Sequence, residues 1–221
     1  ACSDDQGTTN PPGGGGDQVT TAKVGSKYIY DFKILDKNGA VDPSAFSLKN
    51  DDTSATIIFT GVSRDTVPSV SVSVDREDST FFNFASDGSL LFRRNWSPYY
   101  DHVEYGAWIP FPGTVGASRT DTVLKKNNFL VLTIKATSKR EADTTITVGS
   151  EALDCRKYST HLAIHYQGGA AYNDGHADMV LYVSKKLGYV VKEWYLRGGQ
   201  NESGNEYEGG HVKMLKSYTL Q

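Results

Sequence analysis

The chain has 221 residues and a formal net charge of -3, with acidic and basic residues interspersed. A chain of this length can bury one sizeable core, and the lack of a basic excess argues against nucleic acid as a partner. No stretch approaches about 20 consecutive apolar residues, so no segment is typical of a membrane-spanning helix. Thirteen Tyr, nine Phe and three Trp against two Met, with short alternating runs of Val, Ile and Thr, indicate an all-β protein.

Residues 1–22 differ in composition from the rest and are predicted to be a leader, followed by a single β domain over residues 23–221. From Ser3 to Asp17 the leader has no aromatic or aliphatic side chain and contains a run of glycines. Such a segment cannot offset the entropy lost on ordering, so it is expected to act as a flexible tether. Ala1 followed by Cys2 resembles the junction of a bacterial lipoprotein signal peptide, where a small residue precedes the lipidated cysteine.

This resemblance implies lipidation of Cys2, so that the membrane is a partner through an N-terminal lipid anchor. Several acyl chains on one cysteine hold a protein firmly, because each buried methylene contributes about 0.8 kcal/mol. Ser3, Asp4 and Asp5 resemble the acidic signal of surface-exported lipoproteins in one group of Gram-negative bacteria. The expected location is therefore the bacterial outer membrane, facing the periplasm or the cell surface. The alternative is an acidic leader on a soluble protein.

The β domain begins with a clear alternation over residues 27–34, which places Tyr28 and Tyr30 on the face predicted to be buried. Asn38-Gly39 then predicts a two-residue hairpin turn, because both positions tolerate positive φ. Further strands are predicted over residues 53–63 and 69–75. Residues 79–86 and 90–94 are predicted to form a hairpin around Asp87-Gly88.

The regular pattern stops between Asn95 and Asn128, which is too long for a simple connection in a compact domain. Residues 119–128 could form one or two helical turns. Aromatic side chains in this connection suit the mouth of a ligand cavity, because their rings are apolar with a polar tip. The predicted ligand-binding residues are Trp96, Tyr99, Tyr100, Tyr105, Trp108 and Phe111. Alternatively, these rings close one end of a barrel as part of its core.

Strands resume at residues 128–138, 142–150, 155–167, 177–186, 188–196 and 211–220, with Gly-rich turns predicted at 168–176 and 197–210. About ten strands with turn signals at near-regular spacing predict one antiparallel, strongly curved sheet or open β-barrel. The fold class expected is thus an all-β half-barrel with a long aromatic-rich connection.

The histidines and carboxylates of the C-terminal half are weak site candidates. His161 and His165 lie on one face of a strand about 13 Å apart, too far for one metal ion, and are expected to face solvent. Asp174, His176 and Asp178 are predicted to lie in a turn, since the spacing of a calcium loop is missing.

Other candidates are discounted for similar reasons. Glu202, Glu206 and Glu208 fit a solvated loop, and Cys155 fits a small buried hydrophobic residue. The sequence contains no G-x-S-x-G, H-E-x-x-H, C-x-x-C or phosphate-binding glycine loop, so no catalytic residue, metal site or cofactor is predicted.

The segment from Thr145 to Leu220 resembles a family of uncharacterised bacterial envelope lipoproteins with the pattern V-x-A-G-x-F-x-C and then Y-x-A-x-G-x-G-x-V-x-x-E. The residues that carry the resemblance are Val148, Gly149, Leu153, Cys155, Tyr182, Leu187, Gly188, Val190 and Val191. It implies a half-barrel shaped like the periplasmic lipoprotein carriers, with a concave side that can hold an apolar ligand. Gly188, between two strands, is expected to adopt positive φ or to form a bulge.

Three functions remain open from the sequence. The first is a non-catalytic envelope lipoprotein that binds or carries an apolar or lipid-like small molecule in the concavity of the sheet. The second is a surface-displayed structural, adhesive or glycan-binding module. The third is a hydrolase that uses two carboxylates, whose separation is spatial and cannot be read from the sequence.

Overall fold

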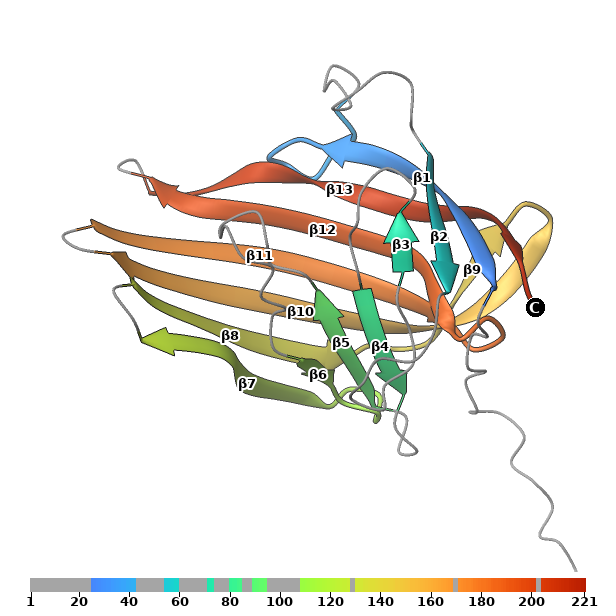
Figure 1. Ribbon diagram of the computed structural model, residues 1–221, viewed down its shortest axis with the longest axis horizontal. Helices are drawn as coiled ribbons and strands as arrows, with labels where there is room; N and C mark the ends of the chain where they lie inside the picture. The colour runs from blue at the N-terminus through green and yellow to red at the C-terminus, as the bar shows by residue number, and fades with distance from the viewer. Residues whose placement is uncertain are drawn as a thin grey trace, which may run out of the picture.

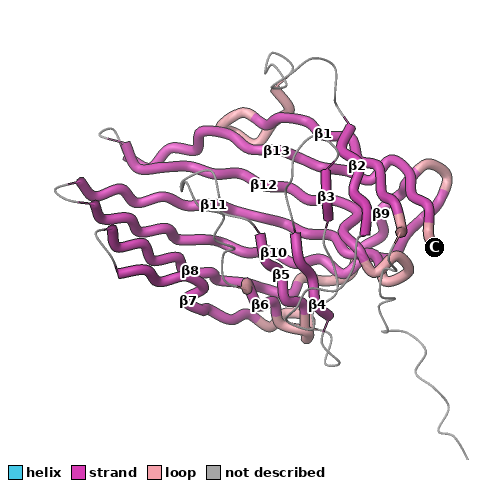
Figure 2. Tube along the Cα trace, viewed as in Figure 1, coloured by secondary structure: helices cyan, strands magenta, loops and turns pink. Residues whose placement is uncertain are grey.

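The computed structural model describes residues 25–42, 54–59, 71–73, 80–84, 89–94, 108–127, 130–168, 171–201 and 204–221. The described part consists of strands and turns without a helix (Figure 2). The strands are β1 (Lys27–Leu35), β2 (Ser54–Phe59), β3 (Ser71–Ser73), β4 (Thr80–Phe84), β5 (Leu90–Arg94), β6 (Ile109–Phe111), β7 (Ser118–Asn127), β8 (Leu130–Arg140), β9 (Thr144–Val148), β10 (Glu151–Gly168), β11 (Ala171–Ser184), β12 (Tyr189–Asn201) and β13 (Gly204–Thr219). The all-β prediction is confirmed.

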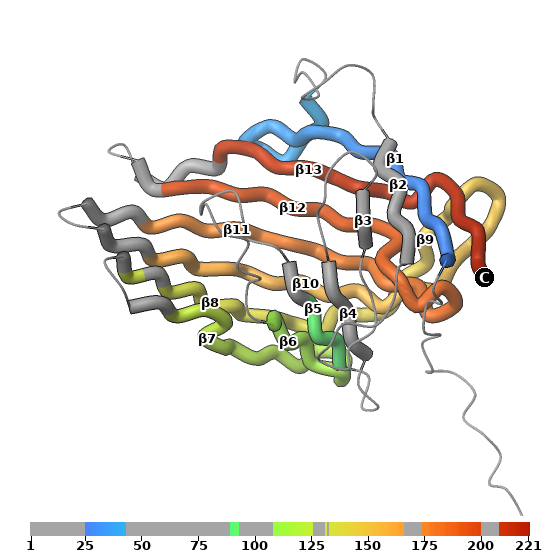
Figure 3. The backbone as a smooth tube through the Cα atoms, in the orientation of Figure 1, coloured from blue at the N-terminus to red at the C-terminus, as the bar shows by residue number. Residues whose placement is uncertain are grey.

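Ten strands form one antiparallel sheet in the order β3-β2-β1-β13-β12-β11-β10-β8-β7, and β9 pairs with β10 beside this path. The sheet is open, because its first and last strands do not pair with each other. Figure 1 shows the long strands β10 to β13 running side by side through its middle. The N-terminal strand β1 lies next to the C-terminal strand β13, as the blue and red tubes of Figure 3 show. The predicted open half-barrel agrees with this sheet.

The remaining strands form a small second sheet, in the order β4-β5-β6, on one face of the large one (Figure 1). Its side chains belong to the same hydrophobic core as those of the large sheet. The ring of Phe111 meets that of Tyr158 edge-on, with 5.4 Å between the ring centroids. We call this covered side of the large sheet the inner face and the opposite side the outer face.

Alternation along the strands decides which residues face the core. In β10, Tyr158 and Leu162 are buried on the inner face, whereas His161 and Ala163 are exposed on the outer face. In β1, Tyr28 and Tyr30 are completely buried, as the sequence predicted. Because side chains of successive strand residues point to opposite faces, the sheet has an apolar inner face and a largely polar outer face.

The first predicted turn is present but one residue longer than expected. The N–H of Asp36 donates to the carbonyl of Ala40 at 2.8 Å, and the N–H of Gly39 donates back to the carbonyl of Asp36 at 3.0 Å. Gly39 has a φ of 77°, which fits a three-residue hairpin loop rather than the two-residue loop predicted. The carboxylate of Asp36 explains the difference, because it accepts from the N–H groups of Asn38 and Ala40.

The irregular connection predicted between residues 95 and 128 contains two strands, β6 and β7. The prediction of one or two helical turns over residues 119–128 is wrong, because β7 pairs with β8 along its length. The register shifts between Thr122 and Leu124, so a β-bulge breaks the alternation that would identify the strand. β7 is the last strand of the sheet and carries several charged side chains, which are typical of an edge strand. These charges further obscure the alternation of polar and apolar residues.

Both Gly-rich turns predicted in the C-terminal half are much shorter than expected. Gly168 pairs with Ala171, and Asn201 pairs with Gly204, so most residues of each predicted turn belong to strands. Glu208 thus lies within β13 instead of in a loop. Gly188 does adopt the predicted positive φ, at 60°, in the turn between β11 and β12. Among the described residues, no helix is long and apolar enough to cross a membrane.

Candidate functional site

Most of the residues predicted to bind a ligand lie outside the described part of the chain. Of the six, these are the aromatic residues Trp96, Tyr99, Tyr100 and Tyr105. The predicted lipidation site, Cys2, also lies outside the described residues. Trp108 is half-buried immediately before β6. Phe111, at the end of β6, is completely buried and therefore belongs to the core. Ligand binding by these residues stays a prediction.

The outer face brings together the histidines and carboxylates that the sequence presented separately. His161 and His165 are exposed on it with half of each side chain accessible, at 52% and 48%, as predicted. Asp174, His176 and Asp178 do not lie in a turn, because all three belong to β11. The pairing of β10 with β11 places them on the same face as the two histidines.

Two histidine–aspartate pairs join β10 to β11. Asp178 lies opposite His161, and its Oδ1 is 2.7 Å from the imidazole Nδ1. Asp174 lies opposite His165, with 2.5 Å between the corresponding atoms. The ring of His176 stacks near that of His161, with 6.3 Å between centroids and 24° between planes. These cross-strand contacts explain why a segment of turn-like composition is held in a strand.

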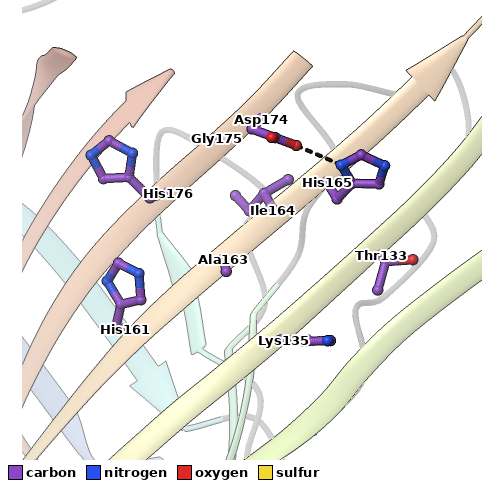
Figure 4. Close-up of a pocket in the computed structure, with 9 residues that line it drawn as sticks. All are labelled: Thr133, Lys135, His161, Ala163, Ile164, His165, Asp174, Gly175 and His176. Carbon is purple, nitrogen blue, oxygen red and sulfur yellow. Dashed lines mark hydrogen bonds and ion pairs between the residues drawn. The ribbon is translucent and has the colours of Figure 1, made fainter. Parts of the chain in front are cut away.

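An open groove with a volume of about 580 Å³ is lined by four of these five residues, all except Asp178. The lining consists of Thr133, Lys135, His161, Ala163, Ile164, His165, Asp174, Gly175 and His176. Figure 4 shows Ala163 between His161 and His165 on β10, with Lys135 on the neighbouring strand β8. Ala163 pairs with Lys135 on one side and His176 on the other. The methyl group of Ala163 is much shorter than the lysine and histidine side chains beside it, so Ala163 forms the floor of the groove.

The groove offers hydrogen-bond donors and acceptors from three adjacent strands. Lys135 supplies an ammonium group, Thr133 a hydroxyl, and the aspartates and histidines supply acceptors and ring nitrogens. No group of three or more His, Cys, Asp or Glu side chains among the described residues has the arrangement of a metal site. The groove thus combines these polar groups with the apolar surface of Ala163 and Ile164. The sequence did not identify Lys135, Thr133 or Ala163 as site residues, because only the register of β8, β10 and β11 places them beside the histidines.

A second polar cluster lies on the inner face, around Glu193. Its carboxylate is 3.2 Å from Nε2 of His211 and 3.0 Å from Nζ of Lys213, and its side chain is only 6% exposed. Phe32 stacks on the imidazole of His211 at 4.9 Å, and the ammonium of Lys213 lies 5.1 Å from the ring centre of Tyr30. The imidazole and the ammonium group thus contact the same carboxylate inside the fold. The cluster joins β12 to β13. The sequence pattern did not predict it.

A third cluster holds the connection after β8. The guanidinium of Arg140 is bound by Asp143 and by the backbone carbonyl of Glu141, and it stacks over the ring of Tyr158 at 5.1 Å. Lys185 adds an ion pair to Asp143 at 2.8 Å. Burial opposes ionisation of Asp143, but the hydrogen bonds from Lys185 and Arg140 outweigh it and lower the pKa of this carboxyl. Its partners point to a structural role.

Cys155 is buried, as the sequence predicted. Burial raises the pKa of its thiol to about 12, with a smaller contribution from the charges of Asp154 and Asp143. A nucleophilic cysteine needs a lowered pKa, so Cys155 lacks the character of a catalytic thiol.

Comparison of the chain with protein-family models, curated proteins and solved structures finds no match. The interpretation of the outer-face groove therefore depends on its own geometry and chemistry.

Proposed function

We propose that this protein is a non-catalytic binding module of the bacterial cell envelope, and that it binds a glycan in the outer-face groove. The observation that carries the proposal is the open groove of about 580 Å³ lined by side chains of β8, β10 and β11. Sugar hydroxyls both donate and accept hydrogen bonds, so they match a surface that mixes carboxylates, imidazoles, a hydroxyl and an ammonium group.

Aromatic side chains extend this surface along the strands toward β12. Tyr182 lies on the same face of β11 as Asp178, half-buried, with the ammonium groups of Lys157 and Lys192 at 5.8 and 5.5 Å from its ring centre. Trp194 on β12 is half-buried and pairs with Val180 between these two residues. Ring faces next to polar groups suit the stacking of sugar rings.

The anchor belongs to the same proposal. A lipid on Cys2 and the tether that follows would hold the domain at the outer membrane, facing the periplasm or the cell surface. Support comes from the Ala1-Cys2 dipeptide and from the apolar-free composition of residues 3–17. A glycan-binding face functions only where glycans are present, and the cell envelope contains them. The proposed location and the proposed ligand therefore agree.

A carrier for an apolar or lipid-like molecule is the second candidate. The open curved sheet with an apolar inner face favours it, as does the resemblance to envelope lipoproteins. However, Leu90, Phe92, Ile109 and Phe111 of the small sheet fill part of that inner face with side chains. The space that an apolar guest would need is thereby reduced, so the groove on the outer face is the stronger candidate.

The test combines glycan binding with one designed variant. Ala163→Ile fills the floor of the groove and keeps every charge, and isoleucine is well suited to a strand. Ala152→Ile is the matched control, since Ala152 is exposed on the same strand, opposite Thr147 and away from the groove. We expect the wild type and Ala152→Ile to bind glycans on an array, and Ala163→Ile to lose that binding.

A second measurement separates the two candidate functions. Native mass spectrometry of the protein purified from its own membrane reports both acylation at Cys2 and any ligand that remains bound. A retained lipid-like molecule together with no glycan binding by the wild type would contradict the glycan proposal and favour the carrier. A Cys2 without added mass would contradict the anchor.

A further inference from the structure

Lys157, Tyr182 and Lys192 form a row across three strands of the outer face. Tyr182 on β11 pairs with Lys157 of β10 on one side and with Lys192 of β12 on the other. The two ammonium groups lie 5.8 and 5.5 Å from the centre of the tyrosine ring, and all three side chains are half-buried. The strands that carry the lysines are about 10 Å apart, so both long side chains can reach a group placed above the strand between them.

The polar groups of this row have no hydrogen-bond or ion-pair partner in the described part of the chain. This holds for the ammonium groups of Lys157 and Lys192, which contact only the ring between them, and for the hydroxyl of Tyr182. The half-buried Lys185, in contrast, contacts Asp143 at 2.8 Å. Because partial burial disfavours a charge that lacks a counter-ion, the row offers two ammonium groups and one hydroxyl to a ligand.

Carboxylates that flank the row across the sheet are ion-paired with other lysines. Glu141, whose backbone N–H donates to the carbonyl of Lys157, contacts the ammonium of Lys139 at 3.1 Å. Beyond the other end of the row, on β1, Asp31 contacts Lys216 at 3.5 Å. Each of these carboxylates is balanced by its own lysine, so the two positive charges of the row are not cancelled.

Carboxylates along the same strands are further away. Asp154 is three residues from Lys157 on β10, and Asp178 is four residues from Tyr182 on β11, which corresponds to about 10 and about 13 Å along a strand. Charges at such distances on a surface are largely screened by salt. Since Asp178 lies between the row and the histidines of the groove, the row is also a separate place on the outer face.

The donors and charges of the row match a phosphate monoester. Such a group carries up to two negative charges near pH 7 and has three strongly accepting oxygens. Lysine binds phosphate as a point charge, and hydrogen bonds between ionised groups are stronger than neutral ones. A carboxylate supplies only one charge and two oxygens, so it would leave part of the row unused.

We propose that Lys157, Tyr182 and Lys192 bind the phosphate group of a phosphate monoester. The ester is a soluble compound or the headgroup of a membrane lipid, and the same oxygens are recognised in both cases. The site goes beyond the proposed glycan binding, because it needs no occupant in the groove.

The experiment titrates the full chain with phosphate esters and their uncharged or zwitterionic counterparts. Glucose 6-phosphate is compared with glucose, and phosphatidylcholine vesicles that contain phosphatidate are compared with vesicles that lack it. The buffer is free of phosphate, at about pH 7.5 and low ionic strength, so that screening is weak. We expect binding to glucose 6-phosphate or to the phosphatidate vesicles, and none to glucose or pure phosphatidylcholine.

Variants of the row test whether these residues make the site. The double variant Lys157→Gln with Lys192→Gln is expected to bind at least about tenfold more weakly than the wild type. Tyr182→Phe keeps the ring but removes the hydroxyl, and is expected to bind about threefold more weakly. The matched control is Lys33→Gln with Lys125→Gln, which removes two positive charges from exposed lysines elsewhere on the outer face and is expected to bind like the wild type.

The two ligand arms identify the source of the phosphate. Binding of glucose 6-phosphate supports the site and assigns it to soluble esters, whereas binding of the phosphatidate vesicles alone supports it and assigns it to a membrane surface. Failure of both to bind overturns the inference, and so does a control variant that weakens binding as much as the lysine variant of the row. Ala163→Ile, which fills the groove, is expected to leave phosphate binding unchanged, so failure of this site and failure of the glycan groove are distinguishable.

Discussion

The hydroxyl of Tyr30 donates a hydrogen bond to the backbone carbonyl of Val190, 160 positions further along the chain, at 2.5 Å. Both residues are buried, and the neighbouring Tyr28 donates in the same way to the carbonyl of Leu187 at 3.3 Å. The rings of Tyr28 and Tyr189 stack at 4.8 Å between centroids. Two tyrosines of β1 thereby hold the first strand against the start of β12 and the turn before it.

Tyr30→Phe is predicted to destabilise the fold by about 1 to 3 kcal/mol, because it leaves a buried carbonyl without its donor while keeping the ring. Urea unfolding at neutral pH measures the effect. Tyr182→Phe is the matched control on the half-buried outer face and is expected to stay within about 0.5 kcal/mol. Equal effects of the two substitutions would show that the hydrogen bond to Val190 contributes nothing specific.

Alkaline pH is predicted to weaken the same junction. Burial raises the pKa of Tyr28 to about 12, an effect partly offset by a hydrogen bond with Ser26. Burial also raises the pKa of Tyr30 well above its usual value. In the unfolded chain tyrosine titrates near pH 10, so the stabilisation is complete below pH 10 and is lost as the pH rises toward 12. For Tyr28 alone the loss is about 2 kcal/mol at pH 12.

The measurement is urea unfolding at a series of pH values from 9 to 12. Tyr28→Phe is expected to reduce the slope of stability against pH in this range, since the group that must ionise is gone. A wild-type stability that stays constant up to pH 12 would contradict the prediction.

Alternation in the sequence was sufficient to predict that Tyr28 and Tyr30 face the core and that His161 and His165 face solvent. Each of these predictions needs only the alternation within one strand, because side chains of adjacent residues point to opposite faces. The all-β class and the open antiparallel sheet follow from many such segments. The pairing of the strand predicted at residues 79–86 with the one predicted at 90–94 could also be predicted, and β4 pairs with β5 in antiparallel register.

The candidate groove could not be predicted in this way, because it depends on the register between strands. Asp174 and His176 surround a glycine, and local composition there is that of a turn. In the fold Gly175 packs against Ile164 of β10, and the flanking residues reach across to His165 and Ala163. Gly175 thus lies inside a strand, where a glycine has the same sequence signature as in a turn. The cluster around Glu193 on the inner face could not be predicted either, because it too depends on the register between strands.

Lys213→Met is predicted to cost about 3 kcal/mol or more, because it takes the ammonium partner from the buried carboxylate of Glu193. The double variant Glu193→Leu with Lys213→Met removes both charges and is expected to recover much of that loss. Thermal and urea unfolding of the single and double variants measure the interaction. A double variant less stable than the sum of the two single changes would contradict an origin in the uncompensated charge.

Gly210 on β13 is predicted to tolerate no side chain at all. A Cβ atom built there would lie 1.8 Å from the carbonyl oxygen of Tyr195, so the β12 and β13 backbones would have to separate. Gly175→Ala is the matched control within the same sheet, because its Cβ would meet nothing closer than 3.4 Å. We expect Gly210→Ala to lose more than about 3 kcal/mol and Gly175→Ala to change stability by less than about 1 kcal/mol. Urea unfolding of both variants measures the difference, and similar stabilities would mean that β12 and β13 are further apart at Gly210 than the fold described here requires.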